Sequence, residues 1–106
     1  QFFSALYVKD LVKIIDIFIK KKIPGIFNVC GNQNYSRVEY LIKTAKKFNL
    51  QTCNISKTKF KKLTNIKNIP LNVTMKNKKI KKLLKFKFTN FEKYLEIIYK
   101  KYGSKF

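Results

Sequence analysis

Apolar and polar residues alternate with helical spacing over residues 7–22. Polar side chains recur every three or four positions, at Lys9, Lys13, Asp16 and Lys20, and leave a broad apolar surface between them. This spacing predicts an amphipathic helix that is largely buried. We expect it to end at residue 23, because Pro24 disfavours helical backbone at the residue before it and Gly25 permits a sharp turn.

Two short runs of β-favouring residues predict strands. Residues 26–30 lie between two glycines, and residues 52–55 follow the second helical segment. That second helix is marked by Ser36 and Glu39, whose spacing is that of a capping box, so we expect a helix from Arg37 to about residue 48, with Asn49 as its left-handed terminator. The two strands are expected to be parallel, with helices packed on them.

The C-terminal half carries weaker periodic signals before residue 77. Residues 56–75 predict an irregular crossing segment, with a helical turn near residues 60–63 and a brief extended piece at 72–75. Residues 77–84 predict a short helix. A second capping-box match at residues 89–92 predicts a final helix with an apolar stripe, ended by Gly103. The chain is therefore expected to be one α/β domain, residues 1–106, with short strands and about four helices.

The net charge of +20 arises from 25 basic and 5 acidic residues. All the basic residues except Arg37 are lysines, whereas recognition of phosphates and guanine edges favours the bidentate guanidinium group. A bias toward Lys, Asn, Ile, Phe and Tyr, which is typical of genomes rich in A and T, accounts for this charge. We therefore expect only a non-specific attraction to nucleic acids, with a dedicated nucleic-acid-binding module as the alternative.

The chain has two cysteines and no histidine, so Cys and His cannot build a four-ligand zinc site, and we predict no metal site. Cys30 and Cys53 are expected to be free thiols of a cytoplasmic protein, and a single bridge between them stays open as an alternative. The longest apolar stretch, residues 11–19, is broken by Lys13 and Asp16, so no membrane-spanning helix is expected.

Four pieces of the chain, in order, resemble the C-terminal part of the extended short-chain dehydrogenase/reductases, in particular dTDP-4-dehydrorhamnose reductases and related nucleotide-sugar epimerases and dehydratases. Residues 7–11 are similar to the Val-x-Asp-Leu helix start of that family, and residues 25–31 to its strand between two glycines. Residues 36–40 are similar to the following Ser-x-x-Glu helix start, and residues 70–84 to its Pro-x-Asn segment and the helix beyond it. The resemblance covers nearly the whole chain.

The resemblance implies the substrate-binding portion of an NAD(P)-dependent nucleotide-sugar reductase or epimerase with a Rossmann-like fold. It implies substrate contacts at Asn72, in the Pro-x-Asn piece, and at Tyr7 and Ser4, where the chain of the family passes the active-site cleft. Each has a structural alternative: Asn72 stabilises a turn, Tyr7 packs in the core, and Ser4 caps the first helix. Asp10 is expected to face the positive end of that helix.

The catalytic elements of the family are missing from these residues. There is no Gly-rich turn for a cofactor pyrophosphate, and no tyrosine has a lysine four residues later. We therefore predict no catalytic residue and no bound cofactor in this chain. The resemblance implies that a domain binding NAD(P) and nucleotide precedes Gln1 in a longer protein.

Two departures concern the basic residues that hold the substrate diphosphate in members of the family. The arginine before Pro-x-Asn is replaced by Ile69, with Lys67 as an electrostatic substitute, and a second basic position corresponds to Phe3. These changes support a further alternative, a regulatory homologue without turnover.

Overall fold

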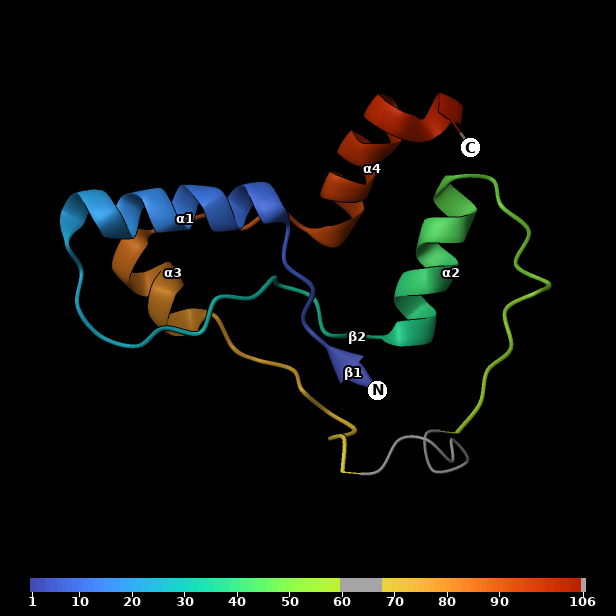
Figure 1. Ribbon diagram of the computed structural model, residues 1–106, viewed down its shortest axis with the longest axis horizontal. Coiled ribbons are helices and arrows are strands. Elements are labelled where there is room, and N and C mark those ends of the chain that lie inside the picture. Colours follow the sequence, from blue (N-terminus) through green and yellow to red (C-terminus); the bar gives the residue numbers. More distant parts are fainter. Residues whose placement is uncertain (60–67, 106) are drawn as a thin grey trace.

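The structure, a computed structural model, describes residues 1–59 and 68–105, and Figure 1 shows their arrangement. These residues form four α-helices, one two-stranded sheet and a short 3-10 helix at Gly103–Lys105. The helices are α1 (Val8–Lys21), α2 (Arg37–Lys47), α3 (Lys78–Leu84) and α4 (Phe91–Tyr102), and the strands are β1 (Phe2–Phe3) and β2 (Tyr35–Ser36). The α/β class and all four predicted helices are confirmed. The helical turn predicted near residues 60–63 lies outside the described residues.

The ends of α1 and α2 follow from their local sequences. Helix α1 ends at Lys22, which has left-handed backbone (φ 50°) and whose N–H donates to the Phe18 carbonyl, directly before the Ile23-Pro24 break. Helix α2 begins with the predicted capping box: the Ser36 hydroxyl accepts from the Glu39 N–H at 3.2 Å, and the Glu39 carboxylate accepts from the Ser36 N–H at 3.2 Å.

Neither predicted strand is formed. Residues 26–30 have no strand beside them among the described residues, and side chains bind part of their backbone instead. The Ile26 carbonyl accepts from Lys79 Nζ at 2.9 Å, and the Cys30 carbonyl accepts from Asn77 Nδ2 at 3.0 Å. Residues 52–55 form a turn in which the N–H of Ile55 donates to the Thr52 carbonyl. A β-favouring run is not a strand without a partner backbone for its N–H and C=O groups.

The observed sheet lies instead near the N-terminus. Strand β1 pairs antiparallel with β2, Phe2 opposite Ser36 and Phe3 opposite Tyr35. On its other side, β1 forms a parallel bridge between Phe2 and Asn72, where the Phe2 N–H donates to the Leu71 carbonyl at 2.9 Å and the Phe2 carbonyl accepts from the Val73 N–H at 2.9 Å. The extended piece predicted at residues 72–75 is thereby attached beside β1.

The buried side chains form two clusters, one for each pair of helices. The first, between α2 and α4, contains Tyr40, Phe91, Tyr94 and Leu95. The second, between α1 and α3, contains Ile14, Ile80 and Phe88. Figure 1 shows α1 and α3 together at one end of the molecule and α2 and α4 at the other. The fold therefore needs a connection between two separate cores.

Asp10 provides that connection. It is 3% exposed, and its carboxylate accepts from the Thr89 N–H at 2.7 Å and from the Thr89 hydroxyl at 2.9 Å. Thr89 stands between Phe88 of one core and Phe91 of the other. Asp10 lies in the first turn of α1, as expected, and its carboxylate also accepts from Thr89. The capping role predicted for Thr89 is wrong, because its hydroxyl binds Asp10 and the N-cap residue of α4 is Asn90.

Helix α4 is capped by groups distant in sequence. Its N-cap residue is Asn90, whose side chain makes no cap hydrogen bond and accepts from Asn32 Nδ2 at 2.8 Å. Gln33 Oε1 accepts from the Phe91 N–H at 3.0 Å. At the other end, Gly103 has right-handed backbone (φ −57°) and continues into the 3-10 helix, so its predicted role as a left-handed terminator is wrong.

Both cysteines are free thiols. Cys53 is exposed, and Cys30 is fully buried, which raises the pKa of its thiol, while Lys81 and Ser4 act in the opposite direction. Within the described residues, every helix is too short or too polar to cross a bilayer.

One face of α1 has no partner among the described residues. The helix buries Asp10 and Ile14, whereas Val8, Val12, Ile15 and Ile19 are 48–70% exposed. These four side chains recur at helical spacing, and we call them the apolar face of α1. The helix is therefore less buried than its sequence predicts.

We expect Asp10→Ala to lower the free energy of unfolding by about 3 kcal/mol, because the Thr89 N–H and hydroxyl would lose a charged acceptor between the two cores. Asp16→Ala is the matched control, since it changes the same charge on the same helix. The Asp16 pair with Lys20 is exposed, so its loss should cost no more than about 0.5 kcal/mol. Urea unfolding followed by circular dichroism measures both values, and equal losses would contradict the role given to Asp10.

Candidate functional site

The structure brings two of the three predicted substrate residues into one region. The Ser4 hydroxyl accepts from the Met75 N–H at 3.0 Å and donates to Asn34 Oδ1 at 2.5 Å. Ser4 therefore attaches the 72–75 segment to the end of β1 and to the loop before β2. It does not cap α1, whose N-cap residue is Tyr7 and lacks a side-chain cap hydrogen bond.

Asn72 lies on the exposed edge of this region. Its Oδ1 accepts from the Thr74 N–H at 3.0 Å and from the Thr74 hydroxyl at 2.7 Å. Asn72 therefore stabilises a turn, as its structural alternative predicts. Its Nδ2 group has no hydrogen-bond partner among the described residues, and the side chain is exposed. Asn72 is thus fixed through its oxygen and keeps two N–H donors for a ligand.

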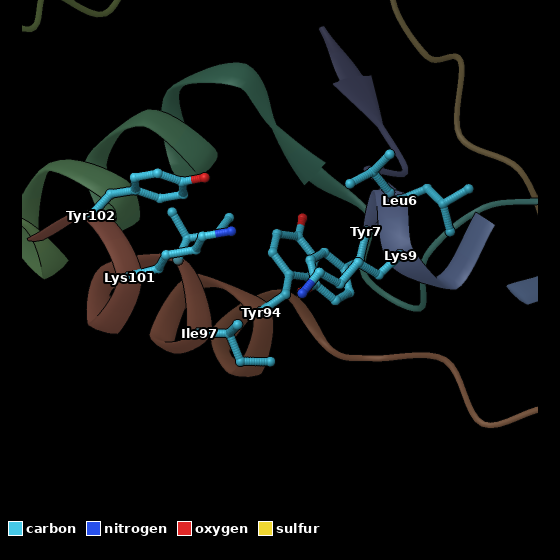
Figure 2. A pocket seen from close by; sticks show the side chains of 9 residues that line it. Leu6, Tyr7, Lys9, Tyr94, Ile97, Lys101 and Tyr102 are labelled. Carbon is cyan, nitrogen blue, oxygen red and sulfur yellow. The ribbon is translucent and has the colours of Figure 1, made fainter. Parts of the chain in front are cut away.

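Tyr7 is placed apart from Ser4 and Asn72. Its ring stacks on that of Tyr94, with centroids 5.2 Å apart and planes 7° apart, and it packs against the core between α2 and α4. It also lines a cavity between the start of α1 and helix α4, shown in Figure 2. Tyr7 therefore packs in the core, which was its structural alternative. It lies apart from the region that contains Ser4 and Asn72.

Arg37 is a candidate that the sequence did not single out as a binding residue. Its Nε donates to Gln1 Oε1 at 2.8 Å, and Gln1 Nε2 donates to the Pro70 carbonyl at 3.0 Å. Its guanidinium carbon lies 5.3 Å from the centre of the Phe3 ring. Arg37 is thus held between the start of β1 and the segment leading to Asn72, while its terminal nitrogens donate to no described residue.

A cavity of about 480 Å³ lies beside Arg37. Its polar lining residues are Gln1, Ser36, Arg37, Ser56, Lys57 and Thr58, and Ile69 also lines it. No acidic side chain is among its described lining residues, which include one arginine, one lysine and three hydroxyl residues, and this composition favours an anionic ligand. Lys67, the substitute expected from sequence, lies outside the described residues.

The arrangement of this region depends on a run of amide side chains before β2. Asn32 accepts from Asn77 Nδ2 at 3.1 Å and donates to Asn90, Gln33 caps α4, and Asn34 binds Ser4. The Tyr40 hydroxyl accepts from the Ala5 N–H at 3.1 Å and thereby holds the chain that leaves β1. The sequence of residues 32–34 indicates only a polar loop, because the groups that these amides bind lie at least 30 residues away in the chain.

Gly31 permits the close approach of this loop to the chain after β1. A Cβ atom at this position would lie 2.0 Å from the Ala5 carbonyl oxygen, so no other residue fits without a backbone shift.

The described residues contain no cluster of three or more His, Cys, Asp or Glu side chains that could hold a metal ion. Comparisons of the chain with models of protein families, with curated proteins and with solved structures find no match.

We expect Ser4→Ala to detach the 72–75 segment locally, because the Met75 N–H and Asn34 Oδ1 would lose their shared hydroxyl partner. Since both groups are near solvent, the free energy of unfolding should fall by only about 1 kcal/mol. Hydrogen exchange at the Met75 amide should become faster than in the unmodified chain. Ser56→Ala is the control, and an unchanged Met75 exchange rate in Ser4→Ala would contradict this role for Ser4.

Proposed function

We propose that this chain is the substrate-binding portion of an NAD(P)-dependent nucleotide-sugar reductase or epimerase, similar to the dTDP-4-dehydrorhamnose reductases. The observation that carries the proposal is that Asn72 and Arg37 flank β1 on its two sides. Asn72 bridges Phe2 on one side, and Arg37 directly follows β2 on the other side and lines a cavity together with Lys57 and Ile69.

The position of Arg37 supports the proposal because its guanidinium lies near the two positions where the basic residues of the family are missing. The resemblance expects basic residues where Phe3 and Ile69 stand. Arg37 lies over the Phe3 ring, and it lines the same cavity as Ile69. One guanidinium is therefore available near both positions, and its planar group suits bidentate binding of a diphosphate.

In this proposal the chain binds and orients the nucleotide sugar and carries out no chemical step. Arg37 and Lys57 hold the diphosphate, and Asn72 donates from Nδ2 to an oxygen of the substrate. The hydride and proton transfers belong to a nucleotide-binding domain that carries NAD(P). The apolar face of α1 is the surface against which that domain packs.

The shape of the chain supports an additional partner domain. Its radius of gyration is 16.5 Å, and its principal extents are 48 × 39 × 18 Å. A compact domain of this length has a radius of gyration of about 13 Å. A flat chain with an open apolar face is typical of a unit that is completed by another surface.

The lysines do not favour the nucleic-acid alternative. They occur on all four helices, with Lys9, Lys43, Lys79 and Lys100 as examples, and not along a single element. This distribution supports a general attraction to polyanions.

We expect Asn72→Asp to weaken the binding of dTDP-glucose by about tenfold or more, because the substitution keeps the oxygen that binds Thr74 but replaces the free donor by a charged acceptor facing the diphosphate. Isothermal titration calorimetry with the 106-residue chain at 0.15 M salt measures the affinity. The control Asn54→Asp makes the same change of charge at an exposed position outside the site and should have an effect below about twofold.

If both variants weaken binding equally, the effect is one of net charge and the site is not at Asn72. If the unmodified chain binds dTDP-glucose no better than pyrophosphate, it does not recognise the nucleotide sugar, and the proposal is contradicted.

We also expect the apolar face of α1 to cause self-association as salt rises. At low salt the charge of +20 keeps chains apart, and at 0.1 M salt the Debye length of about 10 Å screens that repulsion. The sedimentation coefficient of the protein should increase between low and moderate salt. The fluorescence of an added hydrophobic dye should increase over the same range. Val12→Lys should reduce both signals, whereas a dye-silent monomer with a sharp unfolding transition in moderate salt would show that the face needs no partner.

A further inference from the structure

A second cavity, of about 420 Å³, lies between the first turn of α1 and helix α4. Figure 2 shows the side chains around it. They are Leu6, Tyr7, Val8, Lys9, Tyr94, Ile97, Ile98, Lys101 and Tyr102. The volume is in the range of small-molecule sites, and the walls are mostly apolar, with a few polar groups.

Tyr94 is the central polar group of this cavity. The residue is only 8% exposed, and its ring is held between core aromatics, with the Tyr7 ring stacked on it at 5.2 Å and the Phe91 ring at 5.1 Å. No hydrogen-bond partner of its hydroxyl is found among the described residues, and Tyr94 lines this cavity as well as a neighbouring one beside Phe48 and Leu50. Burial raises the pKa of this hydroxyl, and it stays a proton donor at neutral pH.

The remaining polar groups of the cavity are cationic or are donors. Lys9 and Lys101 line it from α1 and α4, and none of the described lining residues is acidic. The backbone N–H groups of Val8 and Lys9, at the start of the 14-residue helix α1, have no acceptor among the described residues, because Tyr7 supplies no side-chain cap. The described lining residues therefore include two lysines and a buried tyrosine, beside the N-terminus of α1.

The apolar walls lie beside these donors. Ile97, which is 38% exposed, and Tyr102, which is 39% exposed, line the cavity along α4 together with Ile98. These walls favour a ligand with an apolar body attached to its anionic group.

We propose that this cavity binds a small amphipathic anion, an aromatic or other apolar body that carries a carboxylate or a phosphate. The anionic group accepts from Tyr94 and pairs with Lys9 and Lys101, and the body packs against Ile97, Ile98 and Tyr102. This site is distinct from the one at Asn72 and Arg37, and it does not depend on the proposed function.

The test uses 2-naphthoate and 2-naphthyl phosphate as anionic probes and 2-naphthalenemethanol as the neutral match, titrated into the 106-residue chain at 0.15 M salt. Both anions should bind saturably and more tightly than the neutral probe. The ratio of the two anionic affinities identifies which headgroup the site prefers. Two-dimensional NMR should show the largest shifts at Tyr7, Tyr94 and Tyr102.

Lys101→Gln should weaken the binding of the preferred anion by about tenfold, the loss expected for one charge-assisted contact. Lys100→Gln is the matched control: it makes the same change of charge on the same helix but at a residue outside the cavity lining, and it should change the affinity by less than about twofold. Circular dichroism and the melting temperature show whether both variants fold.

Tyr94→Phe gives a second test that leaves the net charge and the core ring unchanged. It should weaken anion binding by about fivefold and leave binding of the neutral probe unchanged, since only a hydroxyl donor is lost. Equal effects of Lys101→Gln and Lys100→Gln, unsaturable binding, or an anion affinity unaffected by Tyr94→Phe would overturn the proposal.

Discussion

The fold depends on the buried carboxylate of Asp10. A charged side chain removed from water is costly unless its oxygens are hydrogen-bonded, and both oxygens of Asp10 are, by the N–H and the hydroxyl of Thr89. Because Asp10 lies on α1 and Thr89 lies just before the N-cap residue of α4, this contact holds the α1–α3 core against the α2–α4 core. Each core on its own contains only three or four buried side chains.

Further polar contacts extend this connection. The amide groups of Asn32, Gln33 and Asn34 bind Asn77, the Phe91 N–H and Ser4, and so join one loop to α3, α4 and the end of β1. The edge that carries Asn72 is therefore held by hydrogen bonds, whereas the open side of α1 is apolar. The small chain thus presents a polar edge and an exposed apolar face on different elements.

Features determined by neighbouring residues were predictable from the sequence. The four helices follow from periodicity, the Ser36 capping box from a four-residue spacing, and the left-handed Asn49 (φ 55°) from its place after α2. The strands at 26–30 and 52–55 were predicted wrongly because a strand needs a distant partner that composition does not specify. Thr89 shows the same limit, since its apparent capping spacing could not reveal that Asp10, 79 residues away, binds its hydroxyl.

The candidate site was predictable in part for the same reason. Asn72 and Ser4 were named from a resemblance in local sequence, and they lie in one region. Arg37 could not be selected, because its approach to Phe3 and to the segment before Asn72 arises from the pairing of β1 with β2 and from the side chain of Gln1. Tyr7 was named correctly as a packed aromatic, but its neighbour Tyr94, 87 residues later, defines a different cavity.

A crystal structure of the chain grown with dTDP-glucose would show whether Arg37 and Asn72 bind the nucleotide sugar. We expect a diphosphate within hydrogen-bond distance of the Arg37 guanidinium, and an oxygen of the ligand accepting from Asn72 Nδ2. A diphosphate bound elsewhere, with Arg37 still directed only to Gln1 and Asn72 Nδ2 facing solvent, would contradict it.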